Sequence, residues 1–290
     1  MDRTRTSLKP TLDRGGVIVA PGIYDLISAK LADSMGFDAL YMTGYGVVAS
    51  AFGLPDAGLA SYTQMLDRVA TIAAHTTTPL VADADTGYGG LLNVRETVRG
   101  YEAAGATGIQ IEDQEFPKKC GHTPDRRVIP TEDMVRKIKV AADARRYDDT
   151  LIIARTDARG GMGLDEAIRR AEAYGAAGAD ILFVESPESE AEMETICRRL
   201  DKPCLANMAD GGRTPILSNA RLREVGYRMA IFPSAGFLAA SAALRSVYRT
   251  LRDEGSSRGA TVPLDPLVEM HRLMGFEDVW QFEKRYAETQ

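Results

Sequence analysis

The strongest constraint on the fold of this chain is a regular alternation of short apolar runs with amphipathic segments. Most of the apolar runs are nearly continuous, which is typical of parallel strands that are buried on both faces. We interpret eight such runs as strands, at residues 17–20, 39–42, 80–82, 108–111, 151–154, 181–184, 204–206 and 228–232.

Amphipathic helical segments separate these runs, with apolar residues spaced three or four apart. Thr131 is expected to cap one helix, and the glycines after 102–104 and 174–177 are expected to end two others. Eight β/α units predict an α/β fold, a (β/α)8 TIM-type barrel. A doubly wound sheet is the alternative, but residues 20–25 lack its glycine-rich phosphate turn. The expected helices are 25–35, 63–75, 93–104, 131–146, 164–177, 189–200 and 218–225.

The C-terminal part of the sequence contains no further strand. A linker-like stretch at 255–259 precedes a predicted helix at 266–286, which has one apolar face. We therefore expect a catalytic barrel over 1–254 and a helical extension over 255–290 that packs on the barrel or on a neighbouring subunit.

Composition excludes several classes of protein. The net charge of -6 disfavours binding to nucleic acid or to an anionic membrane. No apolar run approaches the roughly 20 residues of a membrane span, and the N-terminus lacks the apolar core of a signal peptide. Three widely spaced cysteines fit a reducing cytoplasm and a protein without a disulfide framework or a structural zinc site.

Polar residues follow one predicted strand after another. Because active sites of (β/α)8 barrels lie at the carboxyl ends of the strands, these residues are expected to share one end of the barrel. Each of them alone could be a helix cap or part of a structural ion pair, but the whole set favours a functional site. They are Thr43, Gly44, Tyr45, Asp83, Asp85, Glu112, Arg155, Glu185 and Asn207.

The acidic residues of this set predict a metal site. In an extended chain, Asp83 and Asp85 point to the same side, and Glu112 follows the adjacent strand. Oxygen ligands of this kind favour Mg2+, with Mn2+ as a possible substitute, and they hold the ion partly through water. Backbone N–H groups at 43–45 and the side chains of Arg155 and Asn207 are suitable donors for a carboxylate. The expected substrate is a small metal-chelating anion, such as a 2-hydroxy or 2-keto acid.

A basic segment with one cysteine follows the fourth strand, at 118–122 (Lys-Lys-Cys-Gly-His). Neighbouring positive charge lowers a thiol pKa from about 8.5 toward neutrality, which makes Cys120 a candidate acid/base. Gly121 allows the segment to approach a substrate closely. The alternative is a solvated basic loop in which the cysteine has no role.

Over nearly its whole length the chain resembles the isocitrate lyase/phosphoenolpyruvate mutase superfamily. The Lys-Cys-Gly-His segment is typical of its carbon–carbon lyase branch, which includes 2,3-dimethylmalate and methylisocitrate lyases. The resemblance implies Mg2+, a mobile lid that carries Cys120, and a homotetramer that exchanges C-terminal helices. The motifs that carry it are 43–45, 53–56, 83–89, 111–114, 118–122, 154–157 and 207–215.

The resemblance also implies residue roles. Asp83 and Asp85 correspond to the metal carboxylates, and Glu112 belongs to the metal's shell. Cys120 corresponds to the acid/base, and Tyr41 or a metal-bound water takes the hydroxyl proton of the substrate. Arg155 and His122 are also implied to be catalytic: Arg155 polarises the 2-oxygen, and His122 keeps the proton of the cysteine labile. The substrate contacts correspond to Thr43, Gly44, Tyr45, Gly121, Glu185, Asn207 and Asp210.

The implied reaction is cleavage of the C2–C3 bond of a 2-hydroxy dicarboxylate to a 2-keto acid such as pyruvate, with Cys120 protonating the other fragment. Methylisocitrate lyases have arginines where this chain has Leu238 and, in the tail, a residue near Met270. An unpaired third carboxylate would cost several kcal/mol there, so a 2-alkylmalate is the expected substrate. Position 210 has an aspartate where the family usually has a glutamate, so the sequence does not decide whether Asp210 contacts the substrate.

Several alternatives remain at this point. Within the family they are an oxaloacetate hydrolase or decarboxylase, a methylisocitrate lyase and, with less support, a phosphonopyruvate-type enzyme. Outside it, Lys118 or Lys119 could form a Schiff base in a metal-free aldolase, or the barrel could bind a metabolite without turnover.

Overall fold

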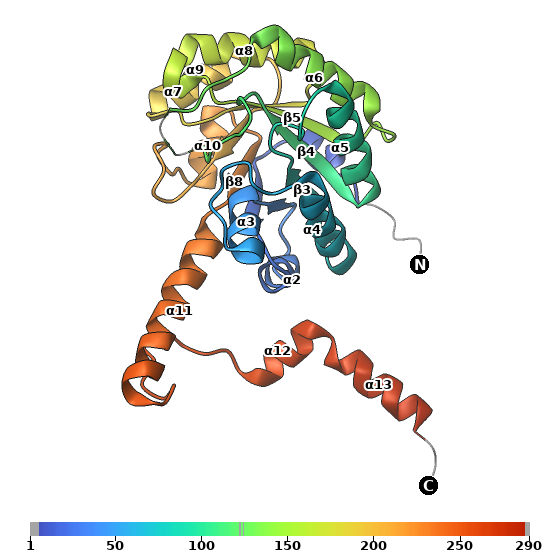
Figure 1. Cartoon of the computed structure of the whole chain (residues 1–290), viewed down its shortest axis with the longest axis vertical. Helices are drawn as coiled ribbons and strands as arrows, with labels where there is room; N and C mark the ends of the chain where they lie inside the picture. Colours follow the sequence, from blue (N-terminus) through green and yellow to red (C-terminus); the bar gives the residue numbers. More distant parts are fainter. Residues whose placement is uncertain (1–5, 122, 124, 288–290) are drawn as a thin grey trace. The chain divides into compact units, whose positions relative to one another are not determined.

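The computed structural model describes residues 6–121, 123 and 125–287. Its parallel strands alternate with helices as a nearly closed barrel, which confirms the predicted fold (Figure 1). Hydrogen bonding orders them β6-β5-β4-β3-β2-β1-β8-β7, and a bridge between Leu182 and Cys204 links the two end strands. The strands are β1 Ile18–Ile23, β2 Leu40–Met42, β3 Leu80–Asp83, β4 Ala106–Glu112, β5 Leu151–Thr156, β6 Ile181–Val184, β7 Leu205–Asn207 and β8 Met229–Phe232.

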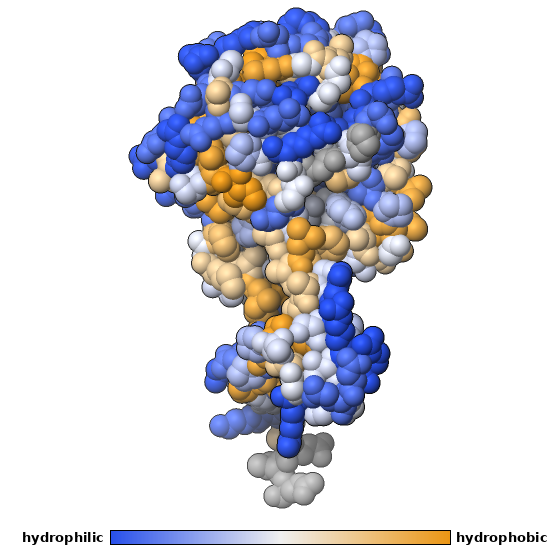
Figure 2. All heavy atoms as spheres, turned by 90° about the vertical axis from the view of Figure 1, so that its left-hand side faces the viewer, coloured by the Kyte–Doolittle hydropathy of each residue, from blue (hydrophilic) through white to orange (hydrophobic). Residues whose placement is uncertain are grey.

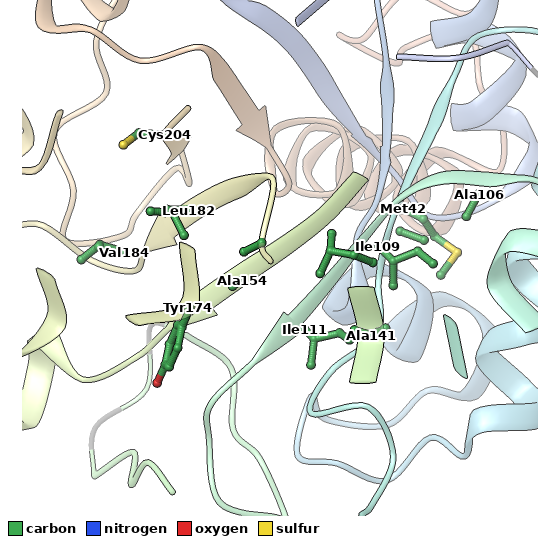
Figure 3. Close-up of a cluster of buried hydrophobic side chains, with 14 of the residues drawn as sticks. Met42, Ala106, Ile109, Ile111, Ala141, Ala154, Tyr174, Leu182, Val184 and Cys204 are labelled. Carbon is green, nitrogen blue, oxygen red and sulfur yellow. The ribbon is translucent and has the colours of Figure 1, made fainter. Parts of the chain in front are cut away.

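Alternate residues of the strands enter two separate cores, since successive side chains of a strand point to opposite faces. In β5, Leu151 and Ile153 belong to the core inside the barrel. Ile152 and Ala154 belong to the core between strands and helices, part of which is drawn in Figure 3. This division explains why the strand sequences are apolar at nearly every position.

The helices that follow the strands use local capping signals. The Asp25 side chain accepts a hydrogen bond from the Ser28 N–H at 2.7 Å and caps α2. Thr131 was expected to be a cap, but it is the first residue of α6, and Pro130 occupies the cap position without a side-chain bond. The helices that precede residue 255 are α1 Lys9–Arg14, α2 Leu26–Ser34, α3 Gly44–Phe52, α4 Tyr62–His75, α5 Leu91–Ala103, α6 Thr131–Ala144, α7 Arg159–Met162, α8 Leu164–Ala176, α9 Glu190–Arg199, α10 Asn219–Val225 and α11 Ala235–Glu254.

The chain divides into two compact units, Met1–Phe237 and Leu238–Gln290. The predicted boundary at 254/255 stays a prediction. The expected single helix at 266–286 is wrong in one respect: Gly275, at φ 84°, divides it into α12 Leu267–Met274 and α13 Phe276–Tyr286. A left-handed residue ends a helix, and glycine adopts that conformation at little cost.

Apolar side chains remain on the surface beside charged ones (Figure 2). In the second unit, Leu267, Trp280 and Phe282 are exposed. Among the described residues, the helices are too short or too polar to cross a lipid bilayer.

Candidate active site

The candidate site lies inside the barrel, where the strands end. The position two residues beyond an inward-facing residue faces inward again. Val81, Ile153, Phe183 and Leu205 belong to the interior core. The residues that follow them by two are all buried: Asp83, Arg155, Glu185 and Asn207. On β4 the corresponding polar residues are Gln110 and Glu112.

The structure brings Asp83 and Asp85 together, but not through the expected extended chain. Asp85 has φ 47°, so the backbone turns directly after β3, and its N–H donates to Asp83 Oδ1 at 3.0 Å. A Cβ on Gly44 would lie 2.7 Å from Asp83 Oδ2 and 3.6 Å from Asp85 Oδ1. Both carboxylates therefore lie against the Gly44 backbone.

Residues 43–45 form the start of α3, a helix that the sequence analysis did not predict. Thr43 is its N-cap, and Gly44 and Tyr45 are its first residues. The first N–H groups of a helix have no partner within it and attract anions. This geometry supports the prediction that the segment can hold a carboxylate. The Tyr45 ring is partly exposed and lies 5.5 Å from that of Phe237.

Lys118 forms ion pairs with two acidic residues of the site. Its ammonium group lies 2.7 Å from Asp85 and 2.5 Å from Asp56, and its side chain is buried. Burial lowers the Lys118 pKa, but Asp85 and Asp56 outweigh that effect and raise the pKa well above its ordinary value. Burial raises the pKa of Asp85 to about 6, against the effect of Lys118. Lys119 is exposed, and its Nζ donates to the Asp125 carbonyl.

Arg155 is held by acidic side chains at the centre of this end of the barrel. Its Nε and Nη2 donate to the two oxygens of Asp157 at 2.9 and 3.0 Å. Glu112 lies 3.4 Å from Nε, and Glu185 lies 3.2 Å from Nη2. Burial disfavours the charge, but these carboxylates, Asp157 first, raise the pKa of Arg155 well above its usual value. Asn207 Nδ2 in turn donates to Glu185 at 3.0 Å.

Two buried oxygens at this end have no hydrogen-bond partner among the described residues: Glu112 Oε1 and Asn207 Oδ1. Burial raises the Glu112 pKa well above its usual value, although Arg155 opposes this. A buried carboxylate oxygen without a partner calls for a bound group, because leaving it unsatisfied is costly. The described residues contain no group of three acidic, histidine or cysteine side chains close enough to enclose an ion. Mg2+ usually takes one or two carboxylates directly and keeps several waters, so Asp83, Asp85 and Glu112 fit that metal if part of the set reaches the ion through water.

Tyr41 lies deeper in the barrel and is poorly suited to be a base. Its hydroxyl donates to Gln110 Oε1 at 3.0 Å, and Gln110 Nε2 donates to Asp83 Oδ1 at 3.3 Å. Burial, together with the charge of Asp83, raises the Tyr41 pKa well above its usual value, so the phenol keeps its proton near neutral pH. The chain of bonds orients Asp83 instead.

The segment that carries Cys120 lies over Arg155. We use the name Cys120 loop for residues 115–127, whose ends meet where Gln114 pairs with Val128. The Cys120 N–H donates to the Asp56 carbonyl at 3.1 Å. The Ser186 hydroxyl donates to the Gly121 carbonyl at 3.3 Å. Cys120 itself is partly exposed, and His122 lies outside the described residues.

Gly121 provides a direct test of this contact. A Cβ there would overlap Arg155 Nη2 and lie 3.1 Å from Glu185 Oε2. We expect Gly121→Ala to lower kcat/KM by about 100-fold, because a displaced loop misplaces its reacting groups. Steady-state kinetics check this. The control is Gly161→Ala, whose Cβ would meet only the Arg126 carbonyl, at 3.9 Å. Equal effects of the two changes would contradict the proposed contact.

Asp210 is the predicted contact that the structure does not bring into the buried cluster. Its side chain is exposed, while its N–H donates to Ser234 Oγ at 3.0 Å. A cavity of about 240 Å³ opens near Arg155, beside Asp157 and Arg213. A larger one, of about 660 Å³, is lined by Pro79 and Gly105, which precede β3 and β4, and so lies away from this chemistry.

Sequence reasoning assigned no role to five residues that the structure places at the site: Asp56, Gln110, Arg126, Asp157 and Ser186. Asp157 carried a signal, since it follows a strand two positions after Arg155. The partner of Asp56, Lys118, is 62 residues away, and no local pattern points to it.

A family model described as phosphoenolpyruvate phosphomutase matches residues 8–252. The 2,3-dimethylmalate lyase of Eubacterium barkeri is 45% identical over 98% of this chain and 98% of its own length. The chain belongs to the phosphoenolpyruvate mutase/isocitrate lyase superfamily. The resemblance drawn from the motifs is therefore confirmed.

Other superfamily members differ in the reaction that their names state. A 2-methylisocitrate lyase of Aeropyrum pernix is 41% identical over 100% of this chain and 92% of its own. Oxaloacetate acetylhydrolase in complex with 3,3-difluorooxalacetate superposes with a TM-score of 0.91 at 34% identity, covering 97% and 96% of the two chains. Phosphonopyruvate hydrolase in complex with oxalate and Mg2+ gives 0.87 at 30% identity, covering 97% and 98%. Membership of the superfamily therefore determines the fold, but it does not by itself identify the substrate.

Proposed function

We propose that this chain is a Mg2+-dependent carbon–carbon lyase that cleaves a 2-alkylmalate, such as 2,3-dimethylmalate, to a 2-keto acid and a carboxylate. The observation that carries the proposal is the position of the Cys120 loop. Gly121 lies against Arg155 and Glu185, over an interior that holds Asp83 and Glu112. The high identity to a 2,3-dimethylmalate lyase supports this substrate class.

The metal proposal rests on the acidic residues. Asp83, Asp85 and Glu112 would hold Mg2+, or Mn2+, largely through water, and a superfamily member has been solved with Mg2+. Bound there, the ion would offset negative charge that develops on the 2-oxygen of the substrate. The unpartnered Glu112 Oε1 is the feature that this assignment explains.

The protein groups account for the rest of the reaction. The α3 N-terminus at residues 43–45 binds one carboxylate, and Arg155 donates to the substrate oxygens. Because Tyr41 keeps its proton, a water molecule accepts the proton of the C2 hydroxyl as the C2–C3 bond breaks. The electron pair of that bond stays on C3, and C2 becomes the carbonyl carbon of the keto acid. The Cys120 Sγ then transfers its proton to C3. Covering the site with the Cys120 loop excludes water and strengthens these interactions.

An oxaloacetate hydrolase is the second candidate, because the oxaloacetate acetylhydrolase fold superposes so well. A Schiff-base aldolase fits less well. The buried Lys118 is held protonated by Asp85 and Asp56, and a protonated amine is not a nucleophile.

The decisive experiment is a turnover screen that measures both loss of the substrate and release of a keto acid, because hydrolysis of oxaloacetate yields oxalate and acetate and no keto acid. Malate, 2,3-dimethylmalate, methylisocitrate, isocitrate, oxaloacetate and phosphonopyruvate are compared with and without Mg2+. We expect the highest kcat/KM for the alkylmalate and, after treatment with EDTA, a loss of about 100-fold or more that Mg2+ or Mn2+ restores. Full activity in EDTA, or turnover of oxaloacetate alone, would refute the proposal.

The assembly and location also remain proposals. We infer a homotetramer that exchanges C-terminal helices, since α12 and α13 carry exposed apolar side chains such as Leu267 and Phe282. A cytoplasmic location agrees with a small-molecule di-acid substrate and with the widely spaced cysteines.

A further inference from the structure

Two neighbouring arginines of the Cys120 loop have opposite surroundings. The Arg127 side chain is 80% exposed and pairs with Glu115 at 3.0 Å. The Arg126 side chain is 5% exposed, and its Nη1 lies 2.6 Å from Asp157 Oδ1. Burying a guanidinium group is costly unless it is well paired, so the position of Arg126 requires this partner.

Asp157 binds Arg126 and Arg155 at the same time. Its Oδ1 accepts from both, at 2.6 Å from Arg126 and 3.0 Å from Arg155. Its Oδ2 accepts from Arg155 Nε at 2.9 Å. The backbone of Asp157 is fixed as well, because its N–H donates to Asp113 at 2.9 Å. The carboxylate thus links the base of the Cys120 loop to the guanidinium group of Arg155.

A cavity lies beside Asp157, so the contact with Arg126 restricts how the Asp157 carboxylate can rotate. The cavity of about 240 Å³ is lined by Arg126, Asp157, Gly160 and Gly161. A Cβ on Gly160 would lie 3.0 Å from Arg126 Nη2, so the guanidinium group occupies the boundary of this cavity. Without it, the Asp157 carboxylate would have room to rotate away from Arg155.

We propose that Arg126 is a positioning residue for Arg155 that acts through the carboxylate of Asp157. The inference rests on the proposed function, in which Arg155 contacts the substrate. Arg126 touches neither substrate nor metal in this assignment; it keeps Asp157 in the orientation that presents both of its oxygens to Arg155.

The test compares Arg126→Met, Arg126→Lys and the matched control Arg127→Met in steady-state kinetics with the alkylmalate and Mg2+. We expect Arg126→Met to lower kcat by about 10- to 100-fold while KM changes less than about threefold, because a misplaced catalytic group costs rate. Arg126→Lys should recover most of the loss, since an ammonium group can still donate to Asp157 Oδ1. The kcat of Arg127→Met should stay within about twofold of the wild-type value.

Four results would overturn the inference. The first is an unchanged kcat in Arg126→Met, and the second is an equal loss in Arg126→Met and Arg127→Met. The third is that Arg126→Lys recovers none of the lost activity. The fourth is a loss of activity that only matches the unfolded fraction measured by thermal denaturation, which a purely structural role would produce.

Failure of the proposed function is distinguishable from failure of this inference. If the unchanged enzyme cleaves no alkylmalate, crystal structures of Arg126→Met and Arg127→Met decide the matter. Loss of the two-bond Arg155–Asp157 pairing in Arg126→Met alone supports the inference. Retention of that pairing in both variants overturns it.

Discussion

Replacing Cys120 by serine should lower kcat for alkylmalate cleavage by about 10²- to 10⁴-fold, the usual contribution of a general acid. A serine hydroxyl is nearly the same size but releases its proton far less readily than a thiol. The loop can remain in place, because its contacts to Asp56 and Ser186 use backbone atoms of Cys120 and Gly121. KM should therefore change little, and initial rates of keto-acid release measure the effect.

Cys197→Ser is the matched control for the loss of a thiol. Cys197 lies on α9, and a hydrogen bond with Cys204, together with burial, raises its pKa above the ordinary value. It is remote from the proton transfer in this assignment, so its replacement should leave kcat almost unchanged. Equal losses in the two variants would remove Cys120 from the mechanism.

The same variant separates a lyase from an oxaloacetate decarboxylase. Decarboxylation leaves an enolate that its keto oxygen stabilises, so solvent can protonate the carbon without the cysteine. Such an enzyme should lose much less activity in Cys120→Ser than a lyase does. Hydrolysis leaves an electron pair on C3 that must be protonated, as lyase cleavage does, so the products oxalate and acetate identify a hydrolase.

Replacing Arg155 by methionine should have the second large effect, on both activity and stability. We expect kcat/KM to fall by at least about 10³-fold, because charge-assisted donors to a reacting oxygen are lost. The folded state should lose about 3–5 kcal/mol, since the buried Glu112 and Glu185 lose their cationic partner and Asp157 keeps only Arg126. Keto-acid release and urea unfolding at pH 7 measure the two effects.

The loss of stability in Arg155→Met should depend on pH because of the Asp157 carboxylate. Burial raises its pKa, but Arg155 and Arg126 outweigh this and lower it below the ordinary value. A depressed pKa contributes stability above the unfolded-state value, and the contribution disappears as pH falls through the folded-state value. The stability difference between the unchanged enzyme and Arg155→Met should therefore shrink below about pH 4.

Arg155→Lys provides the comparison for charge alone. Lysine keeps the positive charge but cannot donate two parallel bonds to Asp157. Its stability should lie between those of the unchanged enzyme and Arg155→Met, while kcat/KM stays strongly reduced. If Arg155→Lys retained full activity, the two-bond geometry would have no catalytic importance.

The sequence alone determined the barrel and most residues at its carboxyl end. Apolar periodicity and helix signals act within 10–15 neighbouring residues, so they can be read locally. The spacing of two along each strand also determined that Asp83, Arg155, Glu185 and Asn207 face the interior with the core residues before them. The family motifs added the roles that we propose for Cys120 and Gly121.

Only the tertiary structure decided which of these groups interact. It paired Lys118 with Asp56 and Asp85, turned the chain at Asp85, and joined Arg126 to Arg155 through Asp157. Each of these depends on burial and on charges from segments far apart in the chain. Ion pairs form where packing excludes water and leaves no other partner. That condition is a property of the assembled barrel, and no local stretch of the sequence encodes it.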